Sequence, residues 1–327
     1  MTSRSAYTAF LCGLLGTCLL LMAATADAAS PPCPLKGPRD AELQSRLEQL
    51  LRRLDLMQAV QDGRLSVALA ILDDSQRPRL AELNGRQMFY AASLPKIAIL
   101  LGAAVELERG ALTMDRQLQT DLNEMIRVSC NACATRVLER VGRERLIEIL
   151  ESPEYRFYDR GGDGGLWVGK PYARGKAYQR DPIAGKSHGA NTLQVVRFYC
   201  ALNQGDLVSP EQSELMLDAL RAPGIHHKFV QALDSFETDA VYRKSGTWQG
   251  YHADSAMVES GDRTYVMVAL AHDPAGARWL ERLGTGLHLL ATSWQDSGVE
   301  AVSVKAPEPQ PGATVSLPEN SSATPER

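Results

Sequence analysis

Ser93 and Lys96 are a serine and a lysine whose spacing could make them act together in chemistry. They lie three positions apart in Ala-Ser-Leu-Pro-Lys, directly before an apolar run that ends at Gly110. In a helix this spacing places two side chains on one face. A serine hydroxyl attacks a carbonyl well only when a base removes its proton, and a lysine is such a base only when neutral. The pair therefore predicts a nucleophile with its base.

The segment from Ala92 to Gly110 is predicted to be one buried helix. Pro95 suits a first helical turn, and Gly110 is a natural stop. The residues between them are apolar on nearly all sides, which is typical of a helix inside a domain. Burial would lower the pKa of Lys96. The alternative, a capping serine beside an ordinary surface lysine, stays open on this motif alone.

Length and charge limit the possible classes of protein. The chain has 327 residues, enough for one large or two smaller domains, and a formal net charge of −4. An acidic balance argues against nucleic acid as the main partner.

Residues 1–28 have the features of an export signal. Arg4 supplies positive charge, residues 9–24 are largely apolar, and Ala26-Asp27-Ala28 resembles a cleavage site. The apolar run is too short to favour a membrane span, so we expect a periplasmic or secreted protein with no stable span after leader removal. At the other end, residues 297–327 are rich in Pro, Ser, Ala and Glu and are predicted to be a disordered tail.

Four cysteines would remain after removal of the leader: Cys33, Cys130, Cys133 and Cys200. Some could pair in an oxidising compartment, and the sequence leaves the pairing open. The Cys-x-x-Cys spacing could indicate a redox or metal site, but no second ligand cluster accompanies it. We therefore favour structural or free cysteines and expect neither a metal nor a cofactor.

Sequence periodicity predicts the elements around Ser93. The pattern at 40–60 indicates an amphipathic helix, and residues 65–72 a strand. Short strands are expected at 80–83 and 87–90, around the turn-forming pair Asn84-Gly85. Helices follow at 112–131, 132–141, 143–150, 192–202 and 210–222. Three antiparallel strands at 239–246, 251–259 and 264–271, then a helix at 275–294, complete the expected order.

Between Ser152 and Ala190 the pattern gives way to glycine, proline and basic residues, which predicts a long irregular loop. Its basic side chains could meet an anionic ligand or simply face solvent; they are Lys170, Arg174, Lys176, Arg180 and Lys186. The simplest packing joins residues 40–92 and 239–296 in a sheet lobe and leaves 93–238 as a helical lobe. Ser93 would then lie at their junction, where clefts tend to form.

Two further motifs carry polar side chains. Ser129-Cys130-Asn131 precedes a predicted helix, and Lys244-Ser245-Gly246-Thr247 lies on a predicted strand. Alone, the first could merely cap a helix, and Lys244 could be an exposed strand lysine. The ordered set Ser-x-x-Lys, Ser-x-Asn and Lys-Ser-Gly is much more specific.

With these motifs in this order, the sequence resembles the penicillin-recognising serine enzymes, that is, class A β-lactamases and penicillin-binding D-Ala peptidases. The resemblance covers roughly residues 40–294. It implies a two-lobed β-lactamase-like fold of the α+β class, an antiparallel sheet flanked by helices plus an all-helical lobe. A monomer is expected, and the expected ligand is a β-lactam or a peptidoglycan stem peptide.

The resemblance also implies catalytic roles. Ser93 would be the acylated nucleophile and Lys96 its base. Ser129 would pass a proton to the leaving nitrogen, and Lys244 would supply positive potential to Ser129 and to the substrate carboxylate.

Substrate-binding roles follow in the same way. Asn131 would hold the substrate amide, and Ser245 and Thr247 would hydrogen-bond the carboxylate. The backbone N–H groups of Ser93 and Thr247 would form the oxyanion hole, worth about 3 kcal/mol per donor. Gly246 would let a substrate backbone lie close to the strand.

The sequence departs from the family pattern in three places. Cys130 replaces the aspartate usual in class A β-lactamases, and the segment between Lys96 and Ser129 is shorter. No glutamate occurs between Glu154 and Glu211, where the family places the carboxylate that activates water. Asp159, Asp163 or Asp181 could substitute, although none has the expected context. Without a substitute, an acyl-enzyme would form and persist.

Three hypotheses follow. The first is a β-lactamase-type serine hydrolase that opens the amide of a β-lactam ring. The second is a D-Ala-D-Ala carboxypeptidase or transpeptidase acting on peptidoglycan stem peptides. The third, a non-catalytic protein that binds peptidoglycan or β-lactam, fits less well with a chain that keeps the serine and both lysines.

Overall fold

The computed structural model describes Cys33, residues 40–74 and residues 78–293. The predicted leader and the predicted disordered tail lie outside these residues. Among the described helices, none combines the length and the apolar character that crossing a bilayer requires. The described elements comprise helices and an antiparallel sheet, so the predicted α+β class is confirmed.

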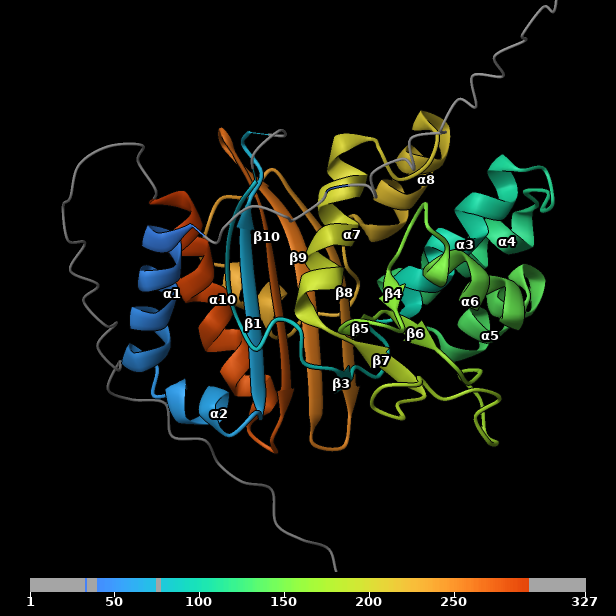
Figure 1. Ribbon diagram of the computed structural model, residues 1–327. Helices are drawn as coiled ribbons and strands as arrows, with labels where there is room; N and C mark the ends of the chain where they lie inside the picture. The colour runs from blue at the N-terminus through green and yellow to red at the C-terminus, as the bar shows by residue number, and fades with distance from the viewer. Residues whose placement is uncertain (1–32, 34–39, 75–77, 294–327) are drawn as a thin grey trace, which may run out of the picture. The chain divides into compact units, whose positions relative to one another are not determined.

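A five-stranded antiparallel sheet forms the centre of residues 40–293, with the strand order β2-β1-β10-β9-β8 (Figure 1). Its strands are β1 Leu65–Ile71, β2 Arg79–Leu83, β8 Ala240–Trp248, β9 Tyr251–Ser260 and β10 Arg263–His272. The predicted meander of the last three strands is confirmed. Leu65 pairs with Ala271, so the early strand β1 joins this meander directly.

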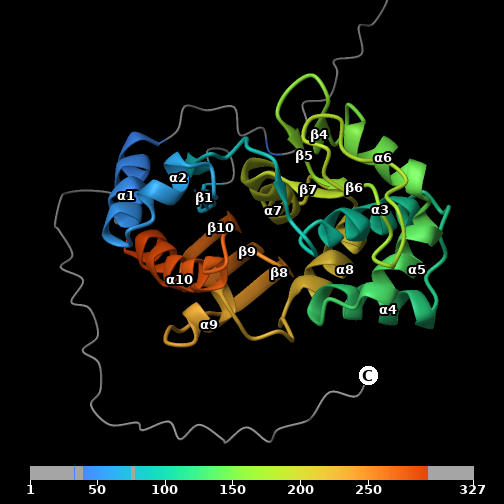
Figure 2. The same cartoon turned by 90° about the horizontal axis from the view of Figure 1, so that it is seen from below.

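Helices cover both faces of this sheet. On one face lie α1 (Ala41–Arg53) and α10 (Gly276–Thr292), and on the other lies α7 (Thr192–Gln204), as Figures 1 and 2 show. All seven residues of β1 are buried as a result. This burial explains the continuous apolar run of β1, because only a strand covered on both faces lacks alternating polar positions.

The remaining long helices surround α3 (Lys96–Glu108), of which eleven residues are buried. Its neighbours are α4 Arg116–Arg127, α5 Asn131–Val141, α6 Arg143–Glu151 and α8 Pro210–Leu220 (Figure 2). A helix with neighbours all round needs no polar face, which is why the apolar run after Lys96 predicts it correctly. α7 lies in the range predicted as the helical lobe but packs on the sheet.

The structure corrects two predictions near the N-terminus. The expected helix at 40–60 is interrupted, because Asp55 adopts a positive φ of 57°; the short α2 (Met57–Gln61) follows. The expected hairpin at Asn84-Gly85 is wrong, since β3 (Phe89–Tyr90) pairs with β7 (His188–Ala190) and not with β2. The Asn84 amide donates to Val60 O and Leu65 O, which directs the chain out of the large sheet.

The predicted loop at 152–190 is more ordered than its composition indicates. It contains the short strands β4 Tyr158–Asp159, β5 Gly164–Gly165 and β6 Trp167–Val168 in addition to β7. Trp167 is completely buried, and its indole N–H donates to Gln179 O at 3.1 Å. Of the basic residues in this segment, Arg174, Lys176 and Arg180 are exposed. One five-residue helix, α9 (Phe229–Leu233), was not expected, because it is too short to show helical periodicity.

Candidate active site

Ser93 lies in the turn between β3 and α3, and not in the helix as predicted. Helix α3 begins at Lys96 with Pro95 as its N-cap. The turn is closed by short-range bonds, among them Lys96 N–H to Ser93 O at 3.2 Å and Ile97 N–H to Leu94 O at 3.2 Å. Proline has no N–H and restricts the residue before it, so the α-helical bonds start only after Pro95. The half-buried Ser93 therefore precedes the buried Lys96 by one tight turn.

Lys96 is completely buried, and its amine is surrounded by oxygen atoms of one neighbouring turn. Its Nζ donates to Ser129 O at 2.6 Å, to Asn131 Oδ1 at 2.8 Å and to Ser129 Oγ at 3.2 Å. The ring of Tyr172 lies 4.6 Å from Nζ. Burial lowers the pKa of Lys96 to about 7, because desolvation disfavours the ammonium form. Near neutral pH, a large fraction of Lys96 can therefore act as a base.

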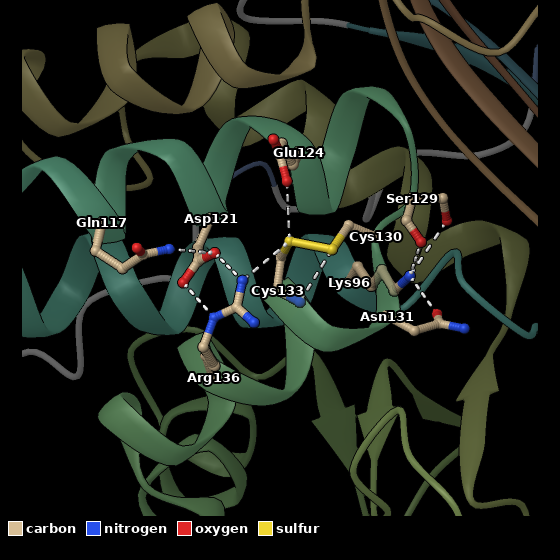
Figure 3. Close-up of a disulfide and its surroundings, with 9 residues drawn as sticks. All are labelled: Lys96, Gln117, Asp121, Glu124, Ser129, Cys130, Asn131, Cys133 and Arg136. Atoms are coloured by element: carbon tan, nitrogen blue, oxygen red, sulfur yellow. Dashed lines mark hydrogen bonds and ion pairs between the residues drawn. A yellow bond between two sulfur atoms is a disulfide. The ribbon is translucent and has the colours of Figure 1, made fainter.

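The turn between α4 and α5 presents Ser129 and Asn131 to this amine. Ser129 has a positive φ of 60°, and Cys130 is the N-cap of α5. The sulfur of Cys130 accepts a hydrogen bond from Cys133 N–H at 3.1 Å and is joined to Cys133 by a disulfide (Figure 3). The predicted position of this motif at a loop-to-helix junction is confirmed.

Lys244 reaches the same hydroxyl from strand β8. Its Nζ donates to Ser129 Oγ at 3.0 Å and to Ser245 O at 2.8 Å. Burial holds the pKa of Lys244 well below its ordinary value, and the charge of Lys96 lowers it further. Two amines from distant elements therefore meet at one hydroxyl, which gives Ser129 a path for proton exchange with either lysine.

Strand β8 lies directly against the turn that carries Ser93. A Cβ atom placed on Gly246 would lie 2.7 Å from Ser93 N and 2.2 Å from Ala91 O. Such distances exclude any side chain at this position, so the approach of strand to turn requires glycine. Gly246 therefore serves the packing of β8 on the Ser93 turn, a role that the resemblance had not implied. Ser245 is buried, and Thr247 is exposed at the end of the same strand.

Lys228 contributes a contact that the sequence did not predict. Its buried amine donates to Gly246 O at 2.8 Å, Thr247 Oγ1 at 2.8 Å and Ala253 O at 3.1 Å. The hydroxyl of Thr247 accepts this bond, so its own hydrogen is free to point elsewhere. No spacing signal marks Lys228, because it reaches β8 from the loop before α9.

A buried ion pair supports strand β8 from behind. Arg243 Nε donates to Asp254 Oδ1 at 2.7 Å, and the same carboxylate accepts Phe229 N–H at 3.2 Å. Asp254 faces Ser245 in the register of β8 and β9. This pair ties two strands and α9 together directly beneath the Lys-Ser-Gly motif.

The Tyr172 ring covers the Lys96 amine and His188 packs on that ring, and neither residue was singled out from the sequence. The Tyr172 hydroxyl donates to Ala92 O at 3.1 Å, next to Ser93. The His188 ring lies 4.3 Å from the Tyr172 ring, and burial lowers the His188 pKa to about 4. At neutral pH this histidine is therefore uncharged.

The three aspartates considered for water activation are engaged elsewhere. Asp181 accepts hydrogen bonds from the Tyr158 hydroxyl and from the backbone N–H groups of residues 183, 184 and 186. Asp163 pairs with Arg86, and Asp159 accepts Gly161 N–H at 3.0 Å. Each therefore has a structural role in its own loop.

The structure brings Lys96, Ser129, Asn131 and Lys244 together in direct contact and places Gly246 against Ser93. Within the described residues, no hydrogen bond joins the Ser93 hydroxyl to the Lys96 amine. One group of possible metal ligands is found there, Glu124 with Cys130 and Cys133. Its two sulfur atoms are joined in a disulfide and so offer no thiolate ligand.

Comparisons with known proteins agree on one family. A family model described as the beta-lactamase enzyme family matches residues 117–287, more than half of the chain. No match was found among curated proteins.

Solved structures with the same fold include a beta-lactamase from Sphaerobacter thermophilus DSM 20745, with 16% identity and a TM-score of 0.58 over 78% of this chain and 99% of that chain. PBP-A matches with 18% identity and a TM-score of 0.56 over 79% of this chain and 98% of that chain. A PBP-A variant, solved as an acyl-enzyme complex with penicillin G, matches with 19% identity and a TM-score of 0.55. The match covers 79% of this chain and 99% of that chain.

Proposed function

Because the chain belongs to the beta-lactamase enzyme family, we propose that it is a serine hydrolase that opens the amide of a β-lactam ring. The reaction would proceed through an acyl intermediate on Ser93. One observation carries this proposal: the amines of Lys96 and Lys244 lie 3.2 Å and 3.0 Å from the Ser129 hydroxyl, beside the turn that holds Ser93. This arrangement can both remove and deliver a proton.

In the acylation step, neutral Lys96 takes the proton of Ser93 as the serine oxygen attacks the carbonyl carbon. Backbone N–H groups of Ser93 and Thr247 would receive the developing oxyanion. When the amide bond breaks, Ser129 gives its proton to the leaving nitrogen and regains one from Lys96. Lys96 is then neutral again, and the acyl group remains on Ser93.

Substrate binding would use the exposed end of strand β8, where Thr247 lies. Lys244 supplies positive potential, and the hydroxyls of Ser245 and Thr247 would bind the substrate carboxylate. Because Thr247 Oγ1 accepts from Lys228, its hydrogen is available to this carboxylate. Asn131 would hold the substrate amide through its NH₂ group, since its Oδ1 is engaged by Lys96.

A second function is favoured by the contacts of the three aspartates that could activate water. Hydrolysis of the acyl-enzyme needs an activated water, yet Asp159, Asp163 and Asp181 are held by other groups. A slowly hydrolysed acyl-enzyme would fit a penicillin-binding D-Ala-D-Ala carboxypeptidase or transpeptidase that acts on peptidoglycan stem peptides.

Intact mass measured over time after addition of penicillin G tests these proposals. A transient adduct with ring-opened product is expected for the hydrolase, whereas a stable adduct would favour the peptidase. Ser93→Ala should abolish the adduct. Absence of any adduct on the native protein, with binding retained, would favour the non-catalytic binding protein.

We also propose that the protein acts outside the cytoplasm, in the periplasm or after secretion. Two disulfides, Cys33–Cys200 and Cys130–Cys133, are compatible with an oxidising compartment. The test is fractionation of cells that express the full-length chain, with the mature N-terminus determined by mass spectrometry.

A further inference from the structure

Cys130 lies in the active-site turn, between the two residues that bind Lys96, and its disulfide partner Cys133 lies on α5. We propose that this disulfide is a positioning element, which holds Ser129 and Asn131 against Lys96, and that its reduction by a dithiol slows the acylation of Ser93. This inference rests on the proposed function, because acylation is its readout.

The contacts of Lys96 depend on the neighbours of Cys130. All three hydrogen bonds described for the Lys96 amine go to Ser129 or Asn131, the residues on either side of this cysteine. Figure 3 shows the disulfide and these contacts side by side. A displacement of Cys130 would therefore change every one of these bonds.

The disulfide connects an accessible turn to the buried core. Cys133 is only 1% exposed, whereas Cys130 is half-buried and Asn131 is exposed. Ser129 is held in the left-handed region, which a non-glycine residue adopts only when its surroundings impose it. The backbone of this turn is also held by Cys130 N–H to Glu124 O at 3.0 Å and by Ala134 N–H to Cys130 O at 3.2 Å. The disulfide adds a covalent link from Cys130 in this turn to the buried Cys133 on α5.

Helices α4 and α5 are also joined by an ion pair that does not involve the disulfide. Reduction should therefore loosen the turn between them without unfolding the protein. Asp121 on α4 is almost completely buried and forms an ion pair with Arg136 on α5, with Arg136 Nε 2.9 Å from Asp121 Oδ2. Gln117 donates to the same carboxylate at 3.1 Å. These contacts do not involve Ser129 or Asn131.

A dithiol supplies all the hydrogens and electrons that reduction of this disulfide needs. One thiolate of the dithiol attacks Cys130 Sγ, the sulfur of the less buried cysteine, and Cys133 leaves as a thiolate that takes a proton. The second thiol of the reagent then displaces Cys130, which also becomes a thiol. The protein gains two hydrogens and two electrons, and the dithiol becomes a cyclic disulfide.

Loosening this turn should change the pH dependence of acylation as well as its rate. The groups that face Lys96 are Lys244 from β8 through the Ser129 hydroxyl, the Tyr172 ring, and His188 from β7. With Ser129 and Asn131 displaced, water would reach the Lys96 amine, and its pKa would rise from about 7 toward its ordinary value. A rise of one unit lowers the neutral fraction about tenfold below that pKa.

The experiment measures the acylation rate with a fluorescent penicillin from about pH 6 to 9, with and without dithiothreitol. It compares the native protein with C130S/C133S and with the matched control C33S/C200S. On reduction, the native protein and C33S/C200S should both slow about fivefold at pH 7, with the midpoint of the pH profile about one unit higher. C130S/C133S should be equally slow and should not respond to the dithiol. Reoxidation should restore the native rate.

Three results would overturn the inference. One is an unchanged rate when mass spectrometry shows both Cys130 and Cys133 as thiols. Another is an equal loss at every pH, which would indicate a general structural role. The third is a C130S/C133S variant whose acylation slows on addition of the dithiol as that of the native protein does. The comparison of C130S/C133S with the native protein does not depend on whether C33S/C200S folds. Native protein that neither takes up label nor releases ring-opened penicillin would instead overturn the proposed function, and this inference with it.

Discussion

At the scale of single residues, the Ser129 hydroxyl is the point at which two lysines meet. Lys96 and Lys244 both lie within hydrogen-bond distance of it, and both have lowered pKa values because they are buried. Two ammonium groups at one oxygen would repel each other. A neutral amine on either lysine removes this repulsion, and the proposed acylation requires that the neutral amine be that of Lys96.

The rate of acylation should therefore rise as the pH increases through about 7, the pKa of Lys96. Below this value Lys96 is protonated and cannot accept a proton from Ser93; above it the amine is neutral. Lys96→Ala should lower the rate about 10²- to 10⁴-fold, the usual contribution of a general base. Labelling kinetics with a fluorescent penicillin check both points. Lys176→Ala, at an exposed lysine, is the control, and native kinetics in Lys96→Ala would contradict the role of the base.

Tyr172 should act on the pKa of Lys96, because its ring lies 4.6 Å from Nζ. In Tyr172→Ala, water would replace the ring and raise that pKa, so we expect a pH midpoint about one unit higher and an acylation rate about fivefold lower at pH 7. Tyr172→Phe keeps the ring and loses only the bond to Ala92 O, so its midpoint should stay near that of the native protein. If Tyr172→Ala and the native protein have the same pH profile of acylation, the ring does not shield the Lys96 amine from water.

Motif spacing could identify the residues of the site, but not all of their contacts. Ser93, Lys96, Ser129 and Lys244 are recognisable because each stands in a short pattern. Lys228, Tyr172 and the Arg243–Asp254 pair carry no such pattern, since each makes its contacts across a distance that only the fold sets. The sequence also could not determine which cysteines form disulfides, because four cysteines can pair in three ways.

At the scale of elements, the decisive contact is strand β8 on the turn before α3. Gly246 lies so close to Ala91 O and Ser93 N that a methyl group could fit only if the strand and the turn moved apart. The same contact fixes the position of Lys244 relative to Ser93.

Gly246→Ala should therefore reduce acylation at least tenfold and destabilise the protein by about 1–3 kcal/mol, as overpacking of a close contact does. Urea unfolding and labelling kinetics measure the two effects. Gly250→Ala is the matched control, because a Cβ there would meet its nearest neighbours at an ordinary 3.7 Å. If Gly246→Ala labels as fast as the control, the close approach has no role in catalysis.

Helices and strands were predictable where their own residues show hydrophobic periodicity. They were missed where a short strand pairs with a segment far away in the sequence. The helices around Lys96 and the last three strands appear at their expected positions, since each shows its own pattern over a continuous segment of the chain. β3 was expected to pair with the strand before it, yet its partner is β7, about a hundred residues further along the chain. Trp167 and its neighbours were assigned to a loop, because burial by distant segments leaves no periodic signal.

At the scale of the whole molecule, the disulfide Cys33–Cys200 closes a loop with a sequence separation of 167. A crosslink over so long a segment restricts the unfolded chain strongly, so C33S/C200S should lose about 3–5 kcal/mol of unfolding free energy. Thermal or urea unfolding measures this loss. Acylation at 25 °C should remain where the variant is folded, and a native-like midpoint of unfolding would contradict the expected stabilisation.

The pairing of β1 with β10 has a consequence for biosynthesis. Leu65 pairs with Ala271, so the central sheet cannot close until β10 has been synthesised. Contacts between segments so far apart in sequence form slowly. A chain arrested before β8 would carry Ser93 and Lys96 but lack both Lys244 and the strand that supports them. Under the proposed function, we therefore expect a nascent chain to take up penicillin only after β8, β9 and β10 have been synthesised.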